Sequence, residues 1–474
     1  MLTHMMATIM GPALTAGPDA STLALAPKNP LPYWRRLAAA RQLDRGPELL
    51  RDSGGPVTRN VLGPKWMIPP LVFVSSPQGA HDVLARTDAF AERAATPVAV
   101  ELRRLLGDNL LVVPHREWLP RRRAVQPIFT KYNVPRFAGH MAEVAEQLAE
   151  RWALGAAVDL DADCRALTLR ALGQSILATD LTHQSQVVGD ALRICGKWAT
   201  DRALRPVNPP RWWPTRGQRR ARAATASLRA LTAEILHACR ADPTRDAPLV
   251  RALMQTIDPD TGQPLSDRAI CDELVLFLLA GHDTTSTVLT YALWALGHRA
   301  ELQQRVAAEA EAVGDRRLTH EDVPRLRYTM QVLHEAMRLC PPAPAVGRTV
   351  MADIEVDGYR LPAGTSAIVG IYAMHRDPAL WEDPLRFDPD RFSPERSKGR
   401  DRWQYLPFGG GPRGCMGDHF AMLEATLALA TILRRTKVLS LSTDFPTVTP
   451  LTMIVAAPIR ARVAVRSDTS LDAD

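Results

Sequence analysis

The chain has 474 residues, 46% of them hydrophobic, so it can bury a large core, and its formal net charge is +7. No basic run is interleaved with aromatic residues, which argues against nucleic-acid binding and for a solvated, weakly basic surface. The six cysteines are far apart and form no Cys-x-x-Cys pair. This pattern argues against a zinc site or a secreted disulfide framework and favours a reducing, cytoplasmic compartment.

The N-terminal residues are predicted to form neither a secretion signal nor a membrane anchor. Residues 1–26 contain no lysine or arginine, and Gly-Pro pairs at 11–12 and 17–18 interrupt them. A secretory signal needs a cationic start, and a membrane anchor needs about 20 unbroken apolar residues. We therefore predict a disordered tail over 1–26 and no integral membrane anchor.

The folded part is predicted to begin at the proline-rich run Pro27–Pro32 and to be mostly helical. Helical periodicity runs from Gly79 to Arg240 and again from Asp267 to Arg299. The runs predicted as strands are 57–62, 71–75, 354–356, 359–361, 367–372, 451–455 and 459–465. Two of them flank Asp357-Gly358, a dipeptide typical of hairpins. The pattern predicts an α+β fold, predominantly α-helical, with small β-sheets to one side.

A proline-rich loop between two predicted helices carries the adjacent pair Trp212-Trp213. Arginines surround the pair at positions 211, 216, 219 and 220. Aromatic rings flanked by cations are typical of segments that touch a membrane surface. A packed surface loop is an equally good interpretation, and the sequence leaves both open.

The predicted helix over 267–299 has an unusual centre, because residues 280–285 read Ala-Gly-His-Asp-Thr-Thr. Glycine, aspartate and threonine weaken an apolar helix, so their presence there indicates a function. Phe277, Gly281 and Thr284 fall on one face with Ala280 beside them. The small residues on that face allow a flat ligand to approach the helix backbone.

The acid and the hydroxyl in this centre suit proton transfer. Asp283 and Thr284 are adjacent and lie next to the face where the ligand would approach. In the plainer interpretation Thr284 bonds to its own helix and Asp283 is a solvated charge. We interpret His282 as structural.

Residues 408–417 read Phe-Gly-Gly-Gly-Pro-Arg-Gly-Cys-Met-Gly, and a helical pattern follows. A Cys415 thiolate would face backbone N–H groups and the positive end of the helix dipole, both of which lower a cysteine pKa. The five glycines remove Cβ atoms where a flat macrocycle would lie. Such a sulfur suits an axial ligand of haem iron. The plainer alternative is a helix entry with one incidental buried cysteine, and we interpret the other five cysteines as core residues.

The loop resembles the haem-binding signature of the cytochrome P450 family, which it matches at Phe408, Gly411, Arg413, Cys415 and Gly417. Residues 280–285 resemble the family's Ala/Gly-Gly-x-Asp/Glu-Thr-Thr/Ser motif. The Glu-x-x-Arg at 335–338 and the segment 389–392 resemble two further family motifs. All four occur in family order, so we expect a single cytochrome P450 catalytic domain over 27–466 and a C-terminal tail over 467–474.

The resemblance implies a cofactor and roles for the motif residues. The cofactor would be haem b, iron protoporphyrin IX, with Cys415 as the metal ligand. Asp283 and Thr284 would be catalytic. Glu335, Arg338 and Arg391 would form a buried structural triad, since ions in a protein interior must be fully bonded. The other residues implied to bind the haem ring or its propionates are Trp118, Arg122, Arg348, Arg413, Phe408, Gly409, Gly281 and Ala280.

Two surfaces follow from the same resemblance. Arg121, Arg122 and Arg123 fit a solvated basic face or a docking surface for an acidic ferredoxin or flavodoxin. The substrate pocket would lie above the haem, bounded in part by the loop 91–113 and the turn 343–347. Its predicted lining residues are Phe277, Ala280, Ala345, Val346 and Val455. These residues are apolar and favour a small lipophilic substrate, although core packing gives the same composition.

The sequence therefore predicts a haem-thiolate monooxygenase. It would use dioxygen and two electrons, passed from NAD(P)H through a reductase and a ferredoxin or flavodoxin, to insert one oxygen atom into its substrate. A peroxide-driven peroxygenase or a haem-thiolate isomerase is a second reading, and a non-catalytic haem sensor or carrier is a third. The intact pair Asp283-Thr284 argues against both alternatives.

Overall fold

Helices make up most of the chain, of which the computed structural model describes residues 20–63, 68–205 and 207–466. The predicted α+β class, predominantly helical, is confirmed. The α-helices are α2 (Tyr33–Ala40), α3 (Arg45–Gly54), α4 (Pro77–Leu84), α5 (Pro97–Leu106), α6 (His115–Val125), α7 (Ala138–Ala153), α8 (Leu160–Leu172), α9 (Ser185–Leu204), α10 (Arg216–Ala241), α11 (Pro248–Met254), α12 (Asp267–Gly297), α13 (Ala300–Glu311), α14 (Arg327–Leu339), α15 (Ile371–His375), α16 (Pro394–Ser397) and α17 (Asp418–Arg435). The short helical turns are η1 (Ala20–Thr22), η2 (Gln126–Phe129), η3 (Val134–Phe137), η4 (Gly173–Leu177), η5 (Thr182–Gln184), η6 (His320–Arg325) and η7 (Pro389–Phe392).

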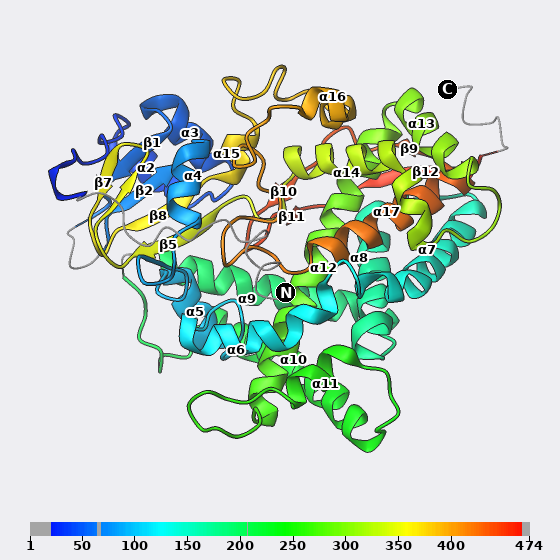
Figure 1. Cartoon of the computed structure of the whole chain (residues 1–474), viewed down its shortest axis with the longest axis horizontal. Coiled ribbons are helices and arrows are strands. Elements are labelled where there is room, and N and C mark those ends of the chain that lie inside the picture. Colours follow the sequence, from blue (N-terminus) through cyan, green and yellow to red (C-terminus); the bar gives the residue numbers. More distant parts are fainter. Residues whose placement is uncertain (1–19, 64–67, 206, 467–474) are drawn as a thin grey trace, which may run out of the picture.

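Small sheets flank the helices. The largest has the strand order β1-β2-β8-β5-β3, in which β2 and β8 run parallel and the other neighbours antiparallel. Figure 1 shows this sheet at the left of the molecule, while the sheet β4-β12-β9 lies toward the right. The strands are β1 (Val57–Asn60), β2 (Leu71–Val74), β3 (Ala91–Glu92), β4 (Ala156–Asp159), β5 (Val346–Val350), β6 (Ile354–Val356), β7 (Tyr359–Leu361), β8 (Ser366–Val369), β9 (Thr436–Ser440), β10 (Thr447–Val448), β11 (Ile454–Val455) and β12 (Arg460–Val465).

Two of the strand predictions have different outcomes. The hairpin around Asp357-Gly358 is confirmed, since β6 and β7 pair on either side of it. The strand predicted over 367–372 is wrong at its C-terminal end, where β8 stops and α15 begins. Gly370 lies at this junction, and a Cβ there would come within 2.7 Å of the Pro47 side chain. The close approach of α3 therefore coincides with the change from strand to helix.

Part of the predicted N-terminal tail is folded. Ala26 is 2% exposed, and the Arg360 N–H donates to the Ala24 carbonyl at 2.8 Å. The chain is thus held against β7 before the proline-rich run that was expected to begin the fold. Residues 1–19 of the tail, and the predicted C-terminal tail over 467–474, lie outside the described residues.

The 31-residue helix α12 crosses the centre of the molecule (Figure 1). It begins after Ser266, whose side chain accepts a hydrogen bond from the Ala269 N–H at 3.3 Å. Helices α8, α10, α14 and α17 pack around it, and most of its side chains are buried. It therefore holds its central residues in fixed positions relative to segments that are far apart in the sequence.

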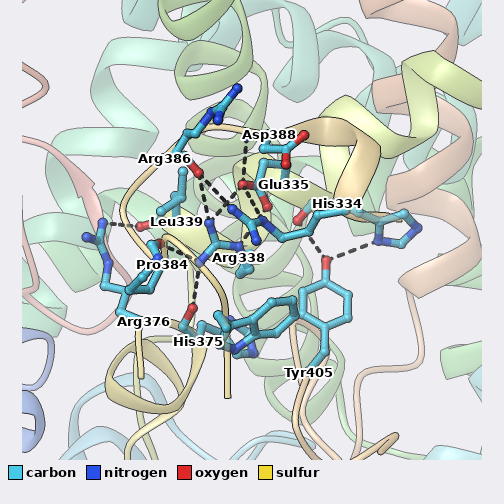
Figure 2. A network of polar contacts seen from close by, with 12 residues as sticks. His334, Glu335, Arg338, Leu339, His375, Arg376, Pro384, Arg386, Asp388 and Tyr405 are labelled. Atoms are coloured by element: carbon cyan, nitrogen blue, oxygen red, sulfur yellow. Dashed lines mark hydrogen bonds and ion pairs between the residues drawn. The ribbon is translucent and has the colours of Figure 1, made fainter. Parts of the chain in front are cut away.

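A buried carboxylate organises the segment that leads into the cysteine loop. Glu335, on α14, accepts hydrogen bonds from Arg338 at 2.7 and 2.8 Å and from Arg391 at 3.2 Å. The Asp388 N–H donates to the same carboxylate at 2.9 Å. Figure 2 shows Glu335 and Arg338 directed at each other. Both arginines predicted to form a triad with Glu335 thus bind its carboxylate, and all three side chains are buried.

Both arginines of this network also bind backbone carbonyls. Arg338 donates to the carbonyls of His375 and Pro384 at 2.7 Å (Figure 2). Arg391 donates to carbonyls within the segment 382–386. Buried ions are tolerated when their hydrogen-bonding groups are satisfied in this way. The network therefore ties α14 to a stretch of chain that has little regular structure of its own.

The same network reaches the cysteine loop through His375. Its Nε2 accepts the Leu406 N–H at 2.9 Å, and the Gly409 N–H donates to the Leu406 carbonyl at 3.0 Å. Burial, followed by the charge of Arg338, lowers the pKa of His375 to about 3. The ring is therefore neutral near pH 7 and can accept this hydrogen bond. In this way the triad positions the first residues of the loop.

We expect Glu335→Gln to prevent assembly of the holoprotein rather than to lower its turnover. The change leaves Arg338 and Arg391 without their anion, which should lower the free energy of unfolding by about 3–5 kcal/mol. Urea denaturation and the haem content after purification measure the effect. Asp390→Asn, which breaks an exposed pair with Arg305, is the control, and an equal loss in that variant would contradict the expectation.

Candidate functional site

The cysteine predicted to be the metal ligand lies in a tight loop directly before α17. The Cys415 N–H donates to the Phe408 carbonyl at 2.9 Å, and the Gly417 N–H donates to the Cys415 sulfur at 3.3 Å. All six cysteines belong to the described residues; four are buried, Cys271 is half-buried and Cys415 is exposed. Cys415 is therefore not an incidental buried cysteine, because its side chain is open on one side and fixed by backbone on the other.

Two glycines of the loop are required by contacts within the protein itself. At Gly411 the φ angle is +70°, and a Cβ would lie 1.8 Å from the Leu84 carbonyl oxygen at the end of α4. At Gly410 a Cβ would lie 2.5 Å from the Trp403 ring. The sequence predicts that all five glycines make room for a macrocycle. For these two, close approach of the chain to itself gives the reason instead.

The loop does not lower the pKa of Cys415 by itself, so that prediction is wrong. Desolvation by the surrounding protein raises the pKa above its ordinary value, and the charge of Asp418 adds to this. The Gly417 N–H and the charges of Arg122 and Arg93 lower it, but by less. A metal cation deprotonates a coordinating thiol outright. The N–H group and the two arginines would then stabilise the thiolate that the metal creates.

Arg413, predicted to bind a propionate, has carboxylate partners inside the protein. Its guanidinium pairs with Asp88 at 2.7 Å and with Glu92 at 3.3 Å. It donates to the Val113 carbonyl at 3.3 Å and lies 4.3 Å from the centre of the Trp118 ring. The charge of Arg413 is therefore balanced by these acids, and the side chain fixes the segments around it.

Three further arginines near the loop form no ion pair with any described carboxylate. They are Arg93, Arg122 and Arg348, and each donates to a backbone carbonyl instead. The acceptors are Leu110 for Arg93 at 3.0 Å, Gly414 for Arg122 at 2.9 Å and Gly347 for Arg348 at 2.8 Å. A second bond from Arg93, to the Arg413 carbonyl at 3.4 Å, links this group directly to the cysteine loop.

The charges of these arginines are unfavourable in the protein alone. Burial, followed by the charges of Arg348 and Arg413, holds the pKa of Arg93 well below its usual value. Burial also lowers the pKa of Arg122, and it lowers that of Arg348 to about 10. A group of partly desolvated cations without anions calls for an anionic ligand. Two propionates would supply that charge next to Cys415, so the residues present fit haem.

Sequence reasoning missed Arg93 and gave Arg121 the wrong surroundings. Arg93 follows β3 within the loop 91–113, and no motif or spacing connects it with Arg348 or Arg413 in the sequence. Arg121 is buried and pairs with Glu273 of α12 at 2.9 Å. Of the three arginines predicted to form a basic face, Arg123 is exposed, Arg122 is half-buried and Arg121 belongs to the interior.

The centre of α12 is open to solvent where its flanks are buried. Ala280 is exposed and Thr284 half-buried, and the Thr284 hydroxyl donates to the Ala280 carbonyl at 2.5 Å. This is the bond to its own helix that the plainer interpretation described. Gly281 lies where a Cβ would come within 2.6 Å of the Leu172 side chain of α8. Helix packing therefore accounts for the glycine at position 281, and Ala280 is the most open residue at this centre.

Asp283 is a buried charge, so its interpretation as a solvated charge is wrong. It is 2% exposed, forms an ion pair with Arg165 of α8 and lies 3.1 Å from His282 Nδ1. Arg165 also pairs with Asp161 at 2.8 Å. Burial would raise the pKa of Asp283, but His282 and Arg165 together hold it below its ordinary value. Asp283 is therefore ionised at neutral pH, and nothing in the sequence indicated Arg165 as its partner.

Stacked aromatic rings connect α12 with the helix that follows the cysteine loop. Phe277 of α12 stacks on Phe129 with ring centres 5.6 Å apart. Phe129 meets Phe420, near the start of α17, at 6.1 Å. The contact fixes the cysteine loop relative to the centre of α12.

The predicted pocket residues differ in burial. Two of them are core residues and three keep open surface: Phe277 and Val455 are buried, Ala345 and Val346 are half-buried, and Ala280 is exposed. The Met453 N–H donates to the Pro342 carbonyl at 2.8 Å, so the C-terminal hairpin lies beside the segment that enters β5. The hairpin that carries Val455 is thus adjacent to the chain that enters the predicted turn 343–347.

The tryptophan pair is exposed on the loop between α9 and α10. Trp212 and Trp213 are 77% and 55% exposed, so the interpretation as a packed loop does not hold for these rings. Arg211 of the same loop pairs with Glu101 of α5 at 2.5 Å. Among the described helices, none combines the length and apolar character that crossing a membrane would need.

Comparison with known proteins gives a family model and several relatives. The model described as Cytochrome P450 matches residues 27–465. Cyclooctatin synthase of Streptomyces melanosporofaciens is 34% identical over 402 residues, which are 84% of this chain and 86% of that protein. Cyclooctat-9-en-7-ol 5-monooxygenase of the same species is 33% identical over 338 residues, 70% and 73% of the two chains. Pentalenene oxygenase of Streptomyces avermitilis is 30% identical over 403 residues, 80% and 89% of the two chains.

We expect Arg93→Gln to change the apoprotein and the holoprotein in opposite directions. Removing an unpaired cation should stabilise the apoprotein, whereas haem should dissociate about tenfold faster because one charge-assisted hydrogen bond is lost. Denaturation of the apoprotein and haem transfer to excess apomyoglobin measure the two effects. Arg104→Gln, on an exposed arginine of α5, is the control. Faster haem loss together with a destabilised apoprotein would show that Arg93 only supports the fold.

Proposed function

Because this chain belongs to the cytochrome P450 family and is a haem-thiolate monooxygenase, we propose that Cys415 binds the iron of haem b through its sulfur. One observation carries this assignment: Cys415 is the exposed cysteine among six, and it is held by a backbone N–H beside a group of unpaired arginines. When bound, haem supplies the iron at which dioxygen is reduced, so that one oxygen atom enters the substrate.

The arginines would hold the haem through its propionates. Arg93, Arg122 and Arg348 form no ion pair with a described carboxylate, and the planar guanidinium of arginine can bind a carboxylate through two hydrogen bonds. Trp118 is buried between Arg413 and Arg122, whose charges lie 4.3 and 5.7 Å from its ring, so it would orient both. In this proposal Arg413 sets the geometry of the site, while the other three arginines neutralise the ligand.

Asp283 and Thr284 would manage protons. The Thr284 hydroxyl donates a hydrogen bond to the Ala280 carbonyl. The lone pairs of its oxygen can therefore accept a hydrogen bond from water on the open face. Asp283 is ionised and lies in the cluster with Arg165 and His282. An ionised carboxylate can accept a proton, which is what a role in proton transfer requires of Asp283.

The names of two relatives, a monooxygenase and an oxygenase, support oxygen insertion over the peroxygenase, isomerase and sensor alternatives. The names cyclooctatin synthase and pentalenene oxygenase, with the apolar residues Ala280, Ala345 and Val346, support a lipophilic substrate of terpenoid type. The family uses redox partner proteins, and we propose a ferredoxin or flavodoxin with its reductase. The exposed Arg123 on α6 supports an acidic partner.

We also propose a cytoplasmic protein that touches membranes through the loop between α9 and α10. The exposure of Trp212 and Trp213, next to several arginines, supports this contact. The scattered free cysteines support a reducing compartment.

The thiolate assignment is tested by the spectrum of the reduced haem protein with carbon monoxide. We expect the strongly red-shifted Soret band of a thiolate-ligated haem in the natural protein and its loss in Cys415→Ser. Cys271→Ser, at a half-buried cysteine of α12, is the control and should keep the band. A folded, haem-containing natural protein without the band would contradict the proposed function.

We expect Thr284→Ala to keep haem and substrate binding but to uncouple electron flow from product formation. Without the hydroxyl, protons are delivered poorly, and peroxide should replace product as the fate of the oxygen. The ratio of product to NAD(P)H consumed, with surrogate ferredoxin and reductase, measures the effect; a fall of about a hundredfold is expected for a lost proton-transfer group. Thr285→Ala is the neighbouring control, and an unchanged ratio in Thr284→Ala would remove that residue from the proposed role.

A further inference from the structure

Two adjacent acids on α12 hold the loop that connects α5 with α6. Glu273 accepts the Leu110 N–H at 3.0 Å. Asp272 lies so close to the loop that a Cβ at Gly107 would come within 1.8 Å of its carboxylate. Both acids are buried, with Glu273 fully inaccessible to solvent. The first half of α12 is therefore bonded to this loop through carboxylates rather than through apolar packing alone.

Each acid also has an arginine partner from another helix. Arg121 of α6 pairs with Glu273 at 2.9 Å and donates to the Asp108 carbonyl at 2.8 Å. Arg229 of α10 pairs with Asp272 at 3.3 Å. Arg121 thus closes a ring that joins α6, the loop and α12. The position of the loop depends on this buried pair.

The other side of the loop binds the arginines of the candidate site. The Leu110 carbonyl accepts a hydrogen bond from Arg93 at 3.0 Å, and the Val113 carbonyl accepts one from Arg413 at 3.3 Å. A single residue, Leu110, therefore donates its N–H to Glu273 and accepts a hydrogen bond from Arg93 at its carbonyl. It forms a direct connection between a buried acid of α12 and the unpaired cations beside Cys415.

We propose that Glu273 is a positioning residue, which holds the loop over residues 107–113 so that Arg93 keeps its place at the haem propionates and Arg413 keeps the geometry of the site. The inference rests on the proposed function, because the arginine positions matter to haem only if they bind it. Glu273 touches neither the cofactor nor the substrate. It acts through the Leu110 peptide.

The proposal predicts a pH dependence of haem retention. Burial raises the pKa of Glu273 to about 7, although Arg121 and the Leu110 N–H lower it. The ionised carboxylate, which binds Arg121 more strongly, is therefore lost as the pH falls through about 7. The charged groups that face this site are Arg121 and Glu117 of α6, Asp272 of α12 and its partner Arg229 of α10.

Global stability should respond in the opposite direction. A raised pKa means that the folded protein binds this proton more tightly than the unfolded chain does. The contribution of Glu273 to the free energy of unfolding is therefore largest at low pH and decreases as the pH rises through the folded-state pKa. If Glu273 positions the loop, haem loss becomes faster as the pH falls, while the contribution of Glu273 to the free energy of unfolding does not decrease. A purely structural role would change both quantities together.

The experiment measures haem transfer from the holoprotein to excess apomyoglobin between about pH 6 and pH 8. We expect the natural protein to lose haem about tenfold faster at the acid end, the change expected for one charge-assisted hydrogen bond. Glu273→Gln should be fast throughout and nearly independent of pH. Glu146→Gln, a buried acid of α7 paired with Arg317 at 2.7 Å, is the control and should follow the natural profile.

Glu273→Gln with the rate and slope of the natural protein would overturn the inference. If that variant yields no holoprotein, the double variant Glu273→Gln with Arg121→Gln removes both charges of the pair, and the same fast, flat profile is expected. The carbon monoxide spectrum distinguishes failure of the Glu273 role from failure of the proposed function. If the natural protein shows the thiolate band but the variants lose haem at its rate and with its pH dependence, only the role of Glu273 is contradicted. If the band is missing, the proposed function is contradicted.

Discussion

The structure around the candidate site depends on one buried carboxylate, that of Glu335. It receives hydrogen bonds from two guanidinium groups and a backbone N–H, and no part of it reaches solvent. The arginines that bind Glu335 donate their other N–H groups to carbonyls at the end of α15 and in the segment that follows it. A stretch with little helix or strand is thereby held in place. His375, at the end of α15, then accepts the Leu406 N–H, and Leu406 lies just before the cysteine loop.

Charge balance distinguishes the two arginine groups of this protein. In the triad the guanidiniums of Arg338 and Arg391 share a carboxylate, so the network is complete without any ligand. Within the described part of the chain, Arg413 beside Cys415 is balanced by acids, while Arg93, Arg122 and Arg348 are bonded to neutral carbonyls. Burying a cation without an anion is unfavourable. The triad is therefore scaffold, and the unbalanced group is where an anionic ligand belongs.

The sequence predicted what local patterns encode. The hairpin at Asp357-Gly358, the long helix α12 and the loop around Cys415 follow from turn chemistry, periodicity and a dense motif. It did not predict partners brought together by the tertiary fold. Arg165 lies 118 residues from Asp283 and Arg121 lies 152 residues from Glu273, and no short-range pattern relates them. At Gly411 the motif correctly requires a glycine, but the structural reason is the close approach of the Leu84 carbonyl, which the sequence does not show.

The acids of α12 show how partners determine what a buried carboxylate can do. Asp283 has both Arg165 and His282 against it, and they outweigh its burial, so it stays ionised. Glu273 has one arginine and one N–H, and burial prevails, so its charge changes near neutral pH. Lying ten residues apart on one helix, the two acids are held rigidly relative to each other. In the proposed function, one passes protons at the open centre of α12, and the other holds the loop that places the arginines. The same helix would therefore serve proton transfer through one acid and the placement of the arginines through the other, and the different partners of the two acids account for the difference.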